Sequence, residues 1–339
     1  MRTNTIWSKL QRRQKRLATW LSTRHVSGPA RFRLASDEVC GVLLGRNIAY
    51  FIPAFMAHYR ALGMKYLVYM DNGSDDGSID LMRGYERVIV LSNRSNFREY
   101  QGYLRKHLGR AYVDGGWRLA VDADEFLRYP NEARIDLPAL ARRLSERGHT
   151  GLLAQMLEMV PEGPLAKVDD LAFDTARERF RHYSLKDISA LPYHSRAIPF
   201  HGFLSQNSLS DERVKILFGG LRRSLFAEDC CLSKHVLYRD GPKVITQPHP
   251  HVSTGLHMAD FTVALQHYKF AGGFLAREQR RQAEGRVSHN ETDLRLEAFA
   301  KAPDMALNLP GMANDPTPEG MLQDGFLTAS EPARKMLGL

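Results

Sequence analysis

The sequence has little cysteine, no long apolar run and, over residues 1–33, no acidic residue. Its three cysteines, Cys40, Cys230 and Cys231, lack metal-ligand spacing, and the adjacent pair cannot readily form an ordinary structural disulfide. No stretch approaches about twenty consecutive apolar residues, which predicts no membrane-spanning helix. The first residues also lack the apolar segment of a cleavable signal peptide. We therefore expect a cytoplasmic protein without structural disulfides.

The positive charge of the chain is concentrated at its N-terminus. Residues 1–33 hold nine Lys or Arg, and the rest of the chain holds 38 basic and 38 acidic residues. A neutral body argues against a folded surface built to bind nucleic acid. Within this arm, Trp7, Leu10, Leu17 and Leu21 recur at helical spacing. A basic amphipathic helix can lie on anionic lipid, at the inner face of the membrane; a disordered tail and a helix docked on the body or on a partner are the alternatives.

A strand, a helix, a second strand and a polar turn are predicted over residues 39–78. Residues 39–47 and 65–70 are the strand-like segments, with the helix-like segment 49–63 between them. A βαβ unit with a right-handed crossover gives a parallel sheet. The turn that follows, Asp-Asn-Gly-Ser-Asp-Asp-Gly-Ser at 71–78, offers acceptors and bare backbone N–H groups. Such a loop can hold a nucleoside, and a solvated turn is the alternative.

Two carboxylates, Asp122 and Asp124, follow another apolar segment at 117–121. In an extended backbone they project to the same face, near the carboxyl end of a predicted strand, where open α/β sheets bind ligands. Two like charges there need a cation, and Mg²⁺ or Mn²⁺ takes carboxylate oxygens together with water and substrate phosphate. The motif predicts a metal that holds a nucleoside diphosphate; an ordinary acidic turn is the alternative.

These segments together resemble the family-2-type glycosyltransferases of bacterial polysaccharide synthesis. The resemblance rests on Arg46-Asn47, on 55–63, on the turn 71–78 and on 117–126, which match in order and spacing as well as in residues. It implies transfer of a sugar from a UDP- or GDP-linked donor to a hydroxyl of a glycan, with inversion at the anomeric carbon. The context would be synthesis of cell-surface polysaccharide or glycoconjugate, with Mn²⁺ or Mg²⁺ as cofactor.

The resemblance also implies a fold and a domain organisation. We expect an α/β fold of the glycosyltransferase A type, which is a Rossmann-like mixed sheet flanked by helices. The catalytic domain would span 34–270. The basic arm 1–33 would precede it, and a helical, then irregular extension over 271–339 would follow.

The same resemblance places candidate residues around the donor. In this family the loop after the second strand binds the nucleotide, which makes candidates of Asp71, Asn72, Asp75 and Asp76. Arg46, at the end of the first strand-like segment, is a further candidate for the nucleotide site. A C-terminal histidine often completes the metal shell opposite the Asp-X-Asp motif. His251 or His267 would be that histidine; a hydrogen-bonded structural role is the alternative for each.

Two further groups of residues could serve transfer. A Gly-Gly hinge before Arg222 and Arg223, with Lys234 downstream, could clamp a departing diphosphate, and exposed arginines at a hinge are the alternative. An inverting transferase needs a carboxylate that takes the proton of the acceptor hydroxyl. The candidates are Asp229 and Glu158, and Glu158 lies near the end of a predicted buried strand over 151–160. The alternative for each is an ordinary surface acid.

Two rival functions stay open at the level of sequence. The carboxylates could serve a metal-dependent phosphohydrolase or nucleotidyltransferase, which would bind a nucleotide-sugar and only hydrolyse it. The chain could instead be a non-enzymatic scaffold whose basic arm finds lipid or nucleic acid. In that case, removal of residues 1–33 would abolish binding of its main ligand, whereas a transferase would still bind its donor.

Overall fold

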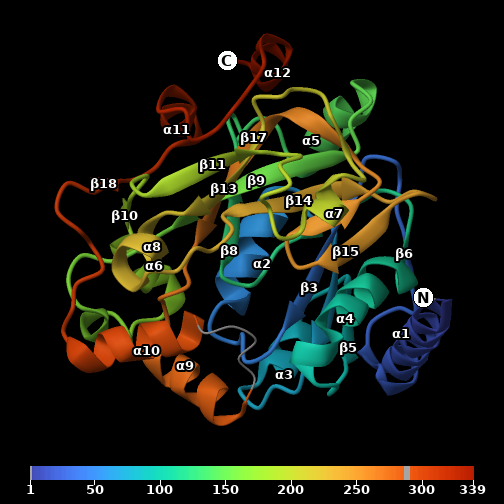
Figure 1. Ribbon diagram of the computed structural model, residues 1–339, viewed down its shortest axis with the longest axis horizontal. Coiled ribbons are helices and arrows are strands. Elements are labelled where there is room, and N and C mark those ends of the chain that lie inside the picture. Colours follow the sequence, from blue (N-terminus) through green and yellow to red (C-terminus); the bar gives the residue numbers. More distant parts are fainter. Residues whose placement is uncertain (1, 286–290) are drawn as a thin grey trace.

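The fold is built around one large mixed β-sheet with helices packed on its faces, as Figure 1 shows. The computed structural model describes residues 2–285 and 291–339. The strands lie in the order β1-β5-β4-β3-β7-β14-β9-β17-β12, and β8 adds to β17. Their bounds are β1 (Arg24–Ser27), β3 (Val39–Gly45), β4 (Tyr66–Asp71), β5 (Val88–Ser92), β7 (Trp117–Ala120), β8 (Glu125–Arg128), β9 (Gly151–Glu158), β12 (Ser208–Leu209), β14 (Ser233–Arg239) and β17 (His257–His267).

The predicted strand-helix-strand unit is present and lies in the parallel half of this sheet. β3 pairs in parallel with β4 on one side and with β7 on the other, and β5 continues the parallel set beside β4. The helix α2 (Ile52–Ala61) connects β3 to β4. The carboxyl ends of parallel strands meet at one edge, so the segments after β3, β4 and β7 come together. The predicted α/β class with a mixed sheet is therefore confirmed, while the glycosyltransferase A assignment stays a prediction.

The other half of the sheet brings distant acids to the end of β17. β14 runs antiparallel between β7 and β9, and β17 runs parallel to β9. In this register His267, the last residue of β17, stands opposite Glu158 of β9 and also opposite Glu125 of β8. The predicted strand over 151–160 is thus confirmed as β9.

The sheet separates two apolar cores, and the strands supply alternate side chains to each. In β4, Leu67 and Tyr69 belong to one core, whereas Val68 and Met70 belong to the other. All four side chains are fully buried. A strand covered on both faces has apolar residues throughout, which is why the central strands show continuous apolar runs instead of alternation.

The remaining elements surround the sheet. The further helices are α1 (Arg2–Ser22), α3 (Ser78–Arg83), α4 (Phe97–Ala111), α5 (Leu137–Glu146), η1 (Leu165–Lys167), α6 (Phe173–Arg179), α7 (His201–Leu204), α8 (Leu221–Phe226), α9 (Phe274–Ala283), α10 (Glu291–Lys301), α11 (Pro318–Gln323) and α12 (Glu331–Leu337). The short paired strands are β2 (Phe32–Arg33) with β6 (Val113–Asp114), β10 (His182–Tyr183) with β18 (Ala313–Asn314), β11 (Ile188–Pro192) with β13 (Lys215–Gly219), and β15 (Ile245–His249) with β16 (Val252–Thr254).

The N-terminal arm and the C-terminal extension both pack on the sheet. In the arm, α1 contacts α4, and β1 extends the sheet by pairing antiparallel with β5. Of the alternatives for the arm, the structure has a helix docked on the body. At the other end, the backbone of Thr328 pairs with Thr262 of β17. The cysteines Cys40, Cys230 and Cys231 are free thiols. Over the described residues, we find no helix with the length and apolar character needed to cross a bilayer.

Candidate functional site

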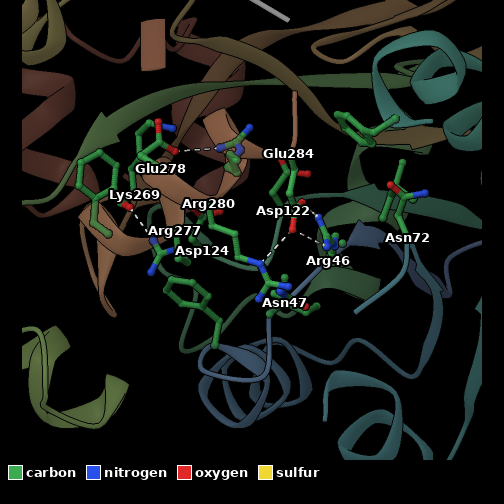
Figure 2. A pocket seen from close by; sticks show the side chains of 18 of the residues that line it. Arg46, Asn47, Asn72, Asp122, Asp124, Lys269, Arg277, Glu278, Arg280 and Glu284 are labelled. Atoms are coloured by element: carbon green, nitrogen blue, oxygen red, sulfur yellow. Dashed lines mark hydrogen bonds and ion pairs between the residues drawn. The ribbon is translucent and has the colours of Figure 1, made fainter. Parts of the chain in front are cut away.

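A cavity of about 290 Å³ lies at the carboxyl ends of β3, β4 and β7. Its walls come from the segments after these strands, from α4, from the end of β17 and from α9 with the residues that follow it (Figure 2). Acidic lining residues are Asp122, Asp124, Glu278 and Glu284, and the basic ones are Arg46, Arg105, Lys269, Arg277, Arg280 and Arg281. Six cations against four carboxylates favour an anionic ligand beside an acidic floor.

Asp122 and Asp124 form that floor, as their position after β7 predicts. Their side chains are 45% and 25% exposed, so an ion can reach them from the cavity. Burial alone would raise the pKa of Asp122, but the charges of Lys234 and Arg105 bring it below its usual value. Burial also opposes ionisation of Asp124, yet the charge and hydrogen bond of His267 hold the pKa of this carboxyl well below its usual range. Both side chains are therefore carboxylates at neutral pH.

Lys234 of β14 supports Asp122 from below the floor. Its ammonium lies 3.2 Å from Asp122 Oδ2 and 2.6 Å from Glu125 Oε2, and the lysine is 3% exposed. Glu125 also accepts the backbone N–H of Asp122 at 2.7 Å. The sequence predicts that Lys234 clamps a departing diphosphate; the structure instead places it beneath the Asp-X-Asp motif, where it fixes one carboxylate.

His267 links Asp124 to Glu158. Its Nδ1 lies 3.0 Å from Glu158 Oε1 and its Nε2 lies 3.4 Å from Asp124 Oδ2. Burial would lower the pKa of His267, but the two carboxylates raise it to about 9. The ring is therefore an imidazolium at neutral pH. In this state it bridges the two acids, and its predicted part in the metal shell stays a prediction.

Glu158 belongs to a buried ion-pair chain rather than to the cavity wall. Arg222 Nε lies 2.8 Å from its Oε1, and Glu158 is 4% exposed. Burial would raise the pKa of Glu158, but His267 and Arg222 lower it to about 2. A carboxylate held by two cations and closed off from solvent is poorly placed to take a proton from an acceptor. Its geometry suits a residue that positions His267.

The chain of ion pairs continues from Arg222 to the helices of the C-terminal extension. Arg222 approaches Glu228 at 3.4 Å, and Glu228 is held by Arg295 of α10 at 3.0 Å. Arg295 also contacts Glu278 of α9 at 2.7 Å, and Glu278 returns to the cavity wall. Four buried charges thereby connect α9 and α10 to Glu158. Arg222 is thus a structural member of this series of ion pairs, whereas the sequence predicts that it contacts the diphosphate.

The loop after β4 is held by its own aspartates. Asp71 is 1% exposed, and its carboxylate accepts the backbone N–H of Gly73 at 2.8 Å and of Ser74 at 3.0 Å. Asp76 accepts the backbone N–H of Ala49 at 2.9 Å. Of the residues predicted to contact a nucleoside, these two hold the loop together and do not line the cavity.

Replacement of Asp71 by alanine should destabilise the fold by about 3 kcal/mol, because it leaves two partly buried backbone donors of the loop without their charged acceptor. Urea unfolding followed by circular dichroism measures the loss. The matched control is Asp80→Ala on α3, an aspartate whose side chain is 81% exposed. Equal stabilities of the two variants would contradict the role given to Asp71.

The other two loop candidates, Asn72 and Asp75, lie nearer the ligand space. Asn72 lines the cavity while its Nδ2 donates to the carbonyl oxygens of Asn93 and Ser95. Asp75 accepts from Asn47 Nδ2 at 2.9 Å and pairs with Arg280 of α9. It stands at the rim, where the loop meets α9.

Arg46 lines the cavity as predicted, and it also connects the β3 end to the segment after α9. Its Nε donates to the carbonyl of Gly73 at 2.9 Å, and its guanidinium pairs with Glu284. Arg280 lies 3.0 Å from the same glutamate, and Figure 2 shows Glu284 with both arginines. Together with the pair between Arg280 and Asp75, these contacts hold the end of α9 over the loop.

Three further predicted site residues, Arg223, Asp229 and His251, are not part of the cavity lining. Asp229 has a side chain that is 69% exposed and pairs with Arg223, so neither of them faces the Asp-X-Asp motif. His251 Nδ1 donates to the carbonyl oxygen of Ser233, 2.9 Å away. Burial and the nearby charge of Lys234 lower the pKa of His251 to about 3, so the ring is neutral. Its predicted part in the metal shell stays a prediction.

The sequence interpretation missed the basic wall made by Arg105, Lys269 and Arg277. Arg105 comes from α4, and Lys269 and Arg277 come from the end of β17 and from α9. Burial, followed by the charges of Arg295 and Arg222, lowers the pKa of Lys269 to about 8. The helical spacing around Arg105 is visible in the sequence, but a basic helix face is usually solvated. Only the packing of α4 and α9 shows that these side chains turn inward.

The floor of the cavity fits a hard divalent cation. Asp122 and Asp124 are ionised and accessible, and their contacts with Lys234 and His267 both use the Oδ2 atoms. Carboxylate oxygens are the ligands that Mg²⁺ and Mn²⁺ prefer, with water and phosphate oxygens at their remaining positions. Within the described residues, no group of three or more His, Cys, Asp or Glu side chains is gathered as a metal-ligand set. Asp122 and Asp124 are the residues that would hold an ion at this floor.

Comparison of the chain with models of protein families finds no match, and no curated protein matches it either.

Proposed function

We propose that this chain transfers a sugar from a nucleotide-sugar donor to a hydroxyl acceptor in a metal-dependent reaction. The observation that supports the proposal most is the pairing, in one cavity, of two accessible carboxylates with a basic wall. The cavity lies where parallel strands end, the usual ligand position of open α/β sheets. A diphosphate needs both features, because its oxygens bind a metal on one side and cations on the other.

Each group at the site has a distinct task in this reaction. A bound Mn²⁺ or Mg²⁺ would neutralise charge on the departing nucleoside diphosphate. Asp122 and Asp124 hold the ion, while Lys234 and His267 fix the orientation of these carboxylates. Arg105, Lys269 and Arg277, which also line the cavity, contact the phosphate oxygens.

The transfer itself exchanges one bond at the anomeric carbon for another. The bond from that carbon to the diphosphate oxygen breaks, and a bond to the acceptor oxygen forms as the acceptor hydroxyl gives its proton to water. In a single displacement the anomeric centre inverts. Asn72 and Asn47, at the ends of β4 and β3, contact the nucleoside side of the donor.

Calorimetric titration of UDP and of GDP, with and without Mn²⁺, tests the donor site. We expect one nucleotide to bind in a metal-dependent manner and the double variant Asp122→Asn, Asp124→Asn to lose the metal-dependent part. Asp80→Asn, which changes an exposed aspartate on α3, is the control and should bind as the unaltered chain does.

Two outcomes count against the proposal. Folded protein that binds neither nucleotide would refute the donor site. A nucleotide-sugar that binds with metal but is only hydrolysed, whatever hydroxyl acceptor is offered, would instead support a phosphohydrolase.

A further inference from the structure

Helix α1 is docked on the body by its polar side. Thr19 is buried, and its carbonyl oxygen accepts from Asn93 Nδ2 at 3.1 Å. One turn earlier, Lys15 lies over the ring of Tyr100 of α4, 5.0 Å from the ring centre, and 3.7 Å from Glu99. An amphipathic helix normally turns its apolar face to the core. Here the opposite orientation leaves the apolar face of α1 uncovered.

That uncovered face carries most of the large apolar side chains that the described residues expose. Six such side chains are exposed, and the four on α1 are Leu10 (45%), Leu17 (55%), Trp20 (62%) and Leu21 (66%). Their spacing places them on one side of the helix, away from Thr19. We call these four residues the apolar face. Exposed apolar side chains that are gathered in one place usually mark a surface that binds something.

A basic groove lies between α1 and α4, and Leu17 and Trp20 of the apolar face also line it. It has a volume of about 980 Å³, and Figure 1 shows the two helices side by side at the end of the molecule where the N-terminus lies. Burial, followed by the charges of Arg16 and Arg110, lowers the pKa of Lys106 in this groove. Its cationic lining residues are Lys9, Arg12, Arg13, Arg16, Lys106 and Arg110.

We propose that the apolar face and the basic groove bind the surface of a bilayer that contains anionic lipid. The apolar side chains would enter the boundary between headgroups and acyl chains, and the groove cations would contact lipid phosphates. Charge complementarity favours an anionic bilayer as the binding partner. A second copy of the chain would bring two sets of six cations together, whereas an anionic bilayer neutralises them.

The geometry also relates this surface to the cavity. Helix α4 contributes Phe97 and Arg105 to the cavity and Lys106 and Arg110 to the groove. The same helix therefore lines both the candidate site and the groove. Whether an acceptor reaches the site from that bilayer depends on the proposed transfer, but binding of the bilayer does not.

Co-sedimentation of the full chain with vesicles tests the proposal. Vesicles of phosphatidylcholine alone are compared with vesicles that contain about 30% phosphatidylglycerol, at low and at high salt. We expect binding to the anionic vesicles that weakens with salt. The variants Leu17→Ser/Trp20→Ser and Arg13→Glu/Arg16→Glu should each lower the partition by about tenfold or more.

Matched controls change side chains of the same kind elsewhere. Leu81→Ser removes an exposed leucine of α3, and Lys301→Glu reverses an exposed charge of α10; both should bind vesicles as the unaltered chain does. Equal binding to both vesicle types, or unchanged binding by both α1 variants, would overturn the proposal. So would light scattering that shows a dimer in the unaltered chain and a monomer in Leu17→Ser/Trp20→Ser. Titration of the same variants with nucleotide tests the donor site independently of vesicle binding.

Discussion

Replacing either Asp122 or Asp124 by asparagine should lower the rate of sugar transfer by about three orders of magnitude. Asparagine keeps the shape of the side chain but removes the negative charge that holds the divalent ion. A bound metal contributes several kcal/mol of charge stabilisation in the transition state, and about 1.4 kcal/mol corresponds to a factor of ten. The loss should fall mainly on kcat, because charge on the departing diphosphate develops in the transition state.

The two variants affect different ion pairs, and in each variant the cation that contacts the replaced aspartate keeps a second carboxylate. In Asp122→Asn, Lys234 keeps its contact with Glu125 at 2.6 Å, and in Asp124→Asn, His267 keeps its contact with Glu158 at 3.0 Å. Both variants should therefore stay folded, which circular dichroism and thermal melting check.

The measurement is steady-state transfer with the donor that the titration identifies, over a range of Mn²⁺ concentrations. Asp80→Asn, with its exposed side chain, should retain full activity. Variants that keep activity within a factor of about ten would show that the Asp-X-Asp carboxylates do not hold a catalytic metal.

The parts of the fold that the sequence predicts are those set by short-range pattern. Apolar runs mark β3 and β4, a largely apolar segment marks β7, and the polar segments after them mark the strand ends. Because parallel strands end at one edge, the position of Asp122 and of the loop after β4 follows from sequence spacing and general sheet geometry. Spacing alone is therefore enough to locate the acidic floor of the cavity.

The residues that the sequence could not place depend on long-range pairing. Lys234 reaches Asp122 only because β14 inserts between β7 and β9. Composition likewise cannot distinguish a carboxylate that faces a ligand from one that accepts backbone N–H groups, and Asp71 proved to be of the second kind.

The histidines show the same limit. The local sequence around His267 favours it as a site residue, but its charge follows from two acids, Asp124 and Glu158, that the sheet brings beside it from elsewhere in the chain. The paired arginines separate for a similar reason, since Arg222 turns into the protein and Arg223 turns outward.

Replacing Arg295 by methionine should lower the free energy of unfolding by about 3–5 kcal/mol, because it leaves two buried carboxylates without their common cation. Arg295 is 2% exposed and contacts Glu228 at 3.0 Å and Glu278 at 2.7 Å. Urea unfolding, with the slope checked for constancy, measures the change. Lys301→Met, on the same helix with its lysine 73% exposed, should change stability by less than about 0.5 kcal/mol.

The effect of this substitution should also depend on pH. Burial would raise the pKa of Glu278, but Lys269, Arg295 and Arg281 lower it to about 2. A lowered pKa gives a contribution to stability that is fully present above the ordinary glutamate value of 4.5 and is lost as the pH falls through about 2. Without Arg295 the pKa of Glu278 rises, so this contribution shrinks at neutral pH and the two stability curves converge in acid. Adding Glu228→Gln and Glu278→Gln to Arg295→Met should restore part of the lost stability, since the two buried side chains that Arg295 neutralised are then uncharged. A loss of less than about 1 kcal/mol at neutral pH, or a loss that grows towards acid pH, would contradict the role of Arg295 as the cation that joins α9 and α10 to the site.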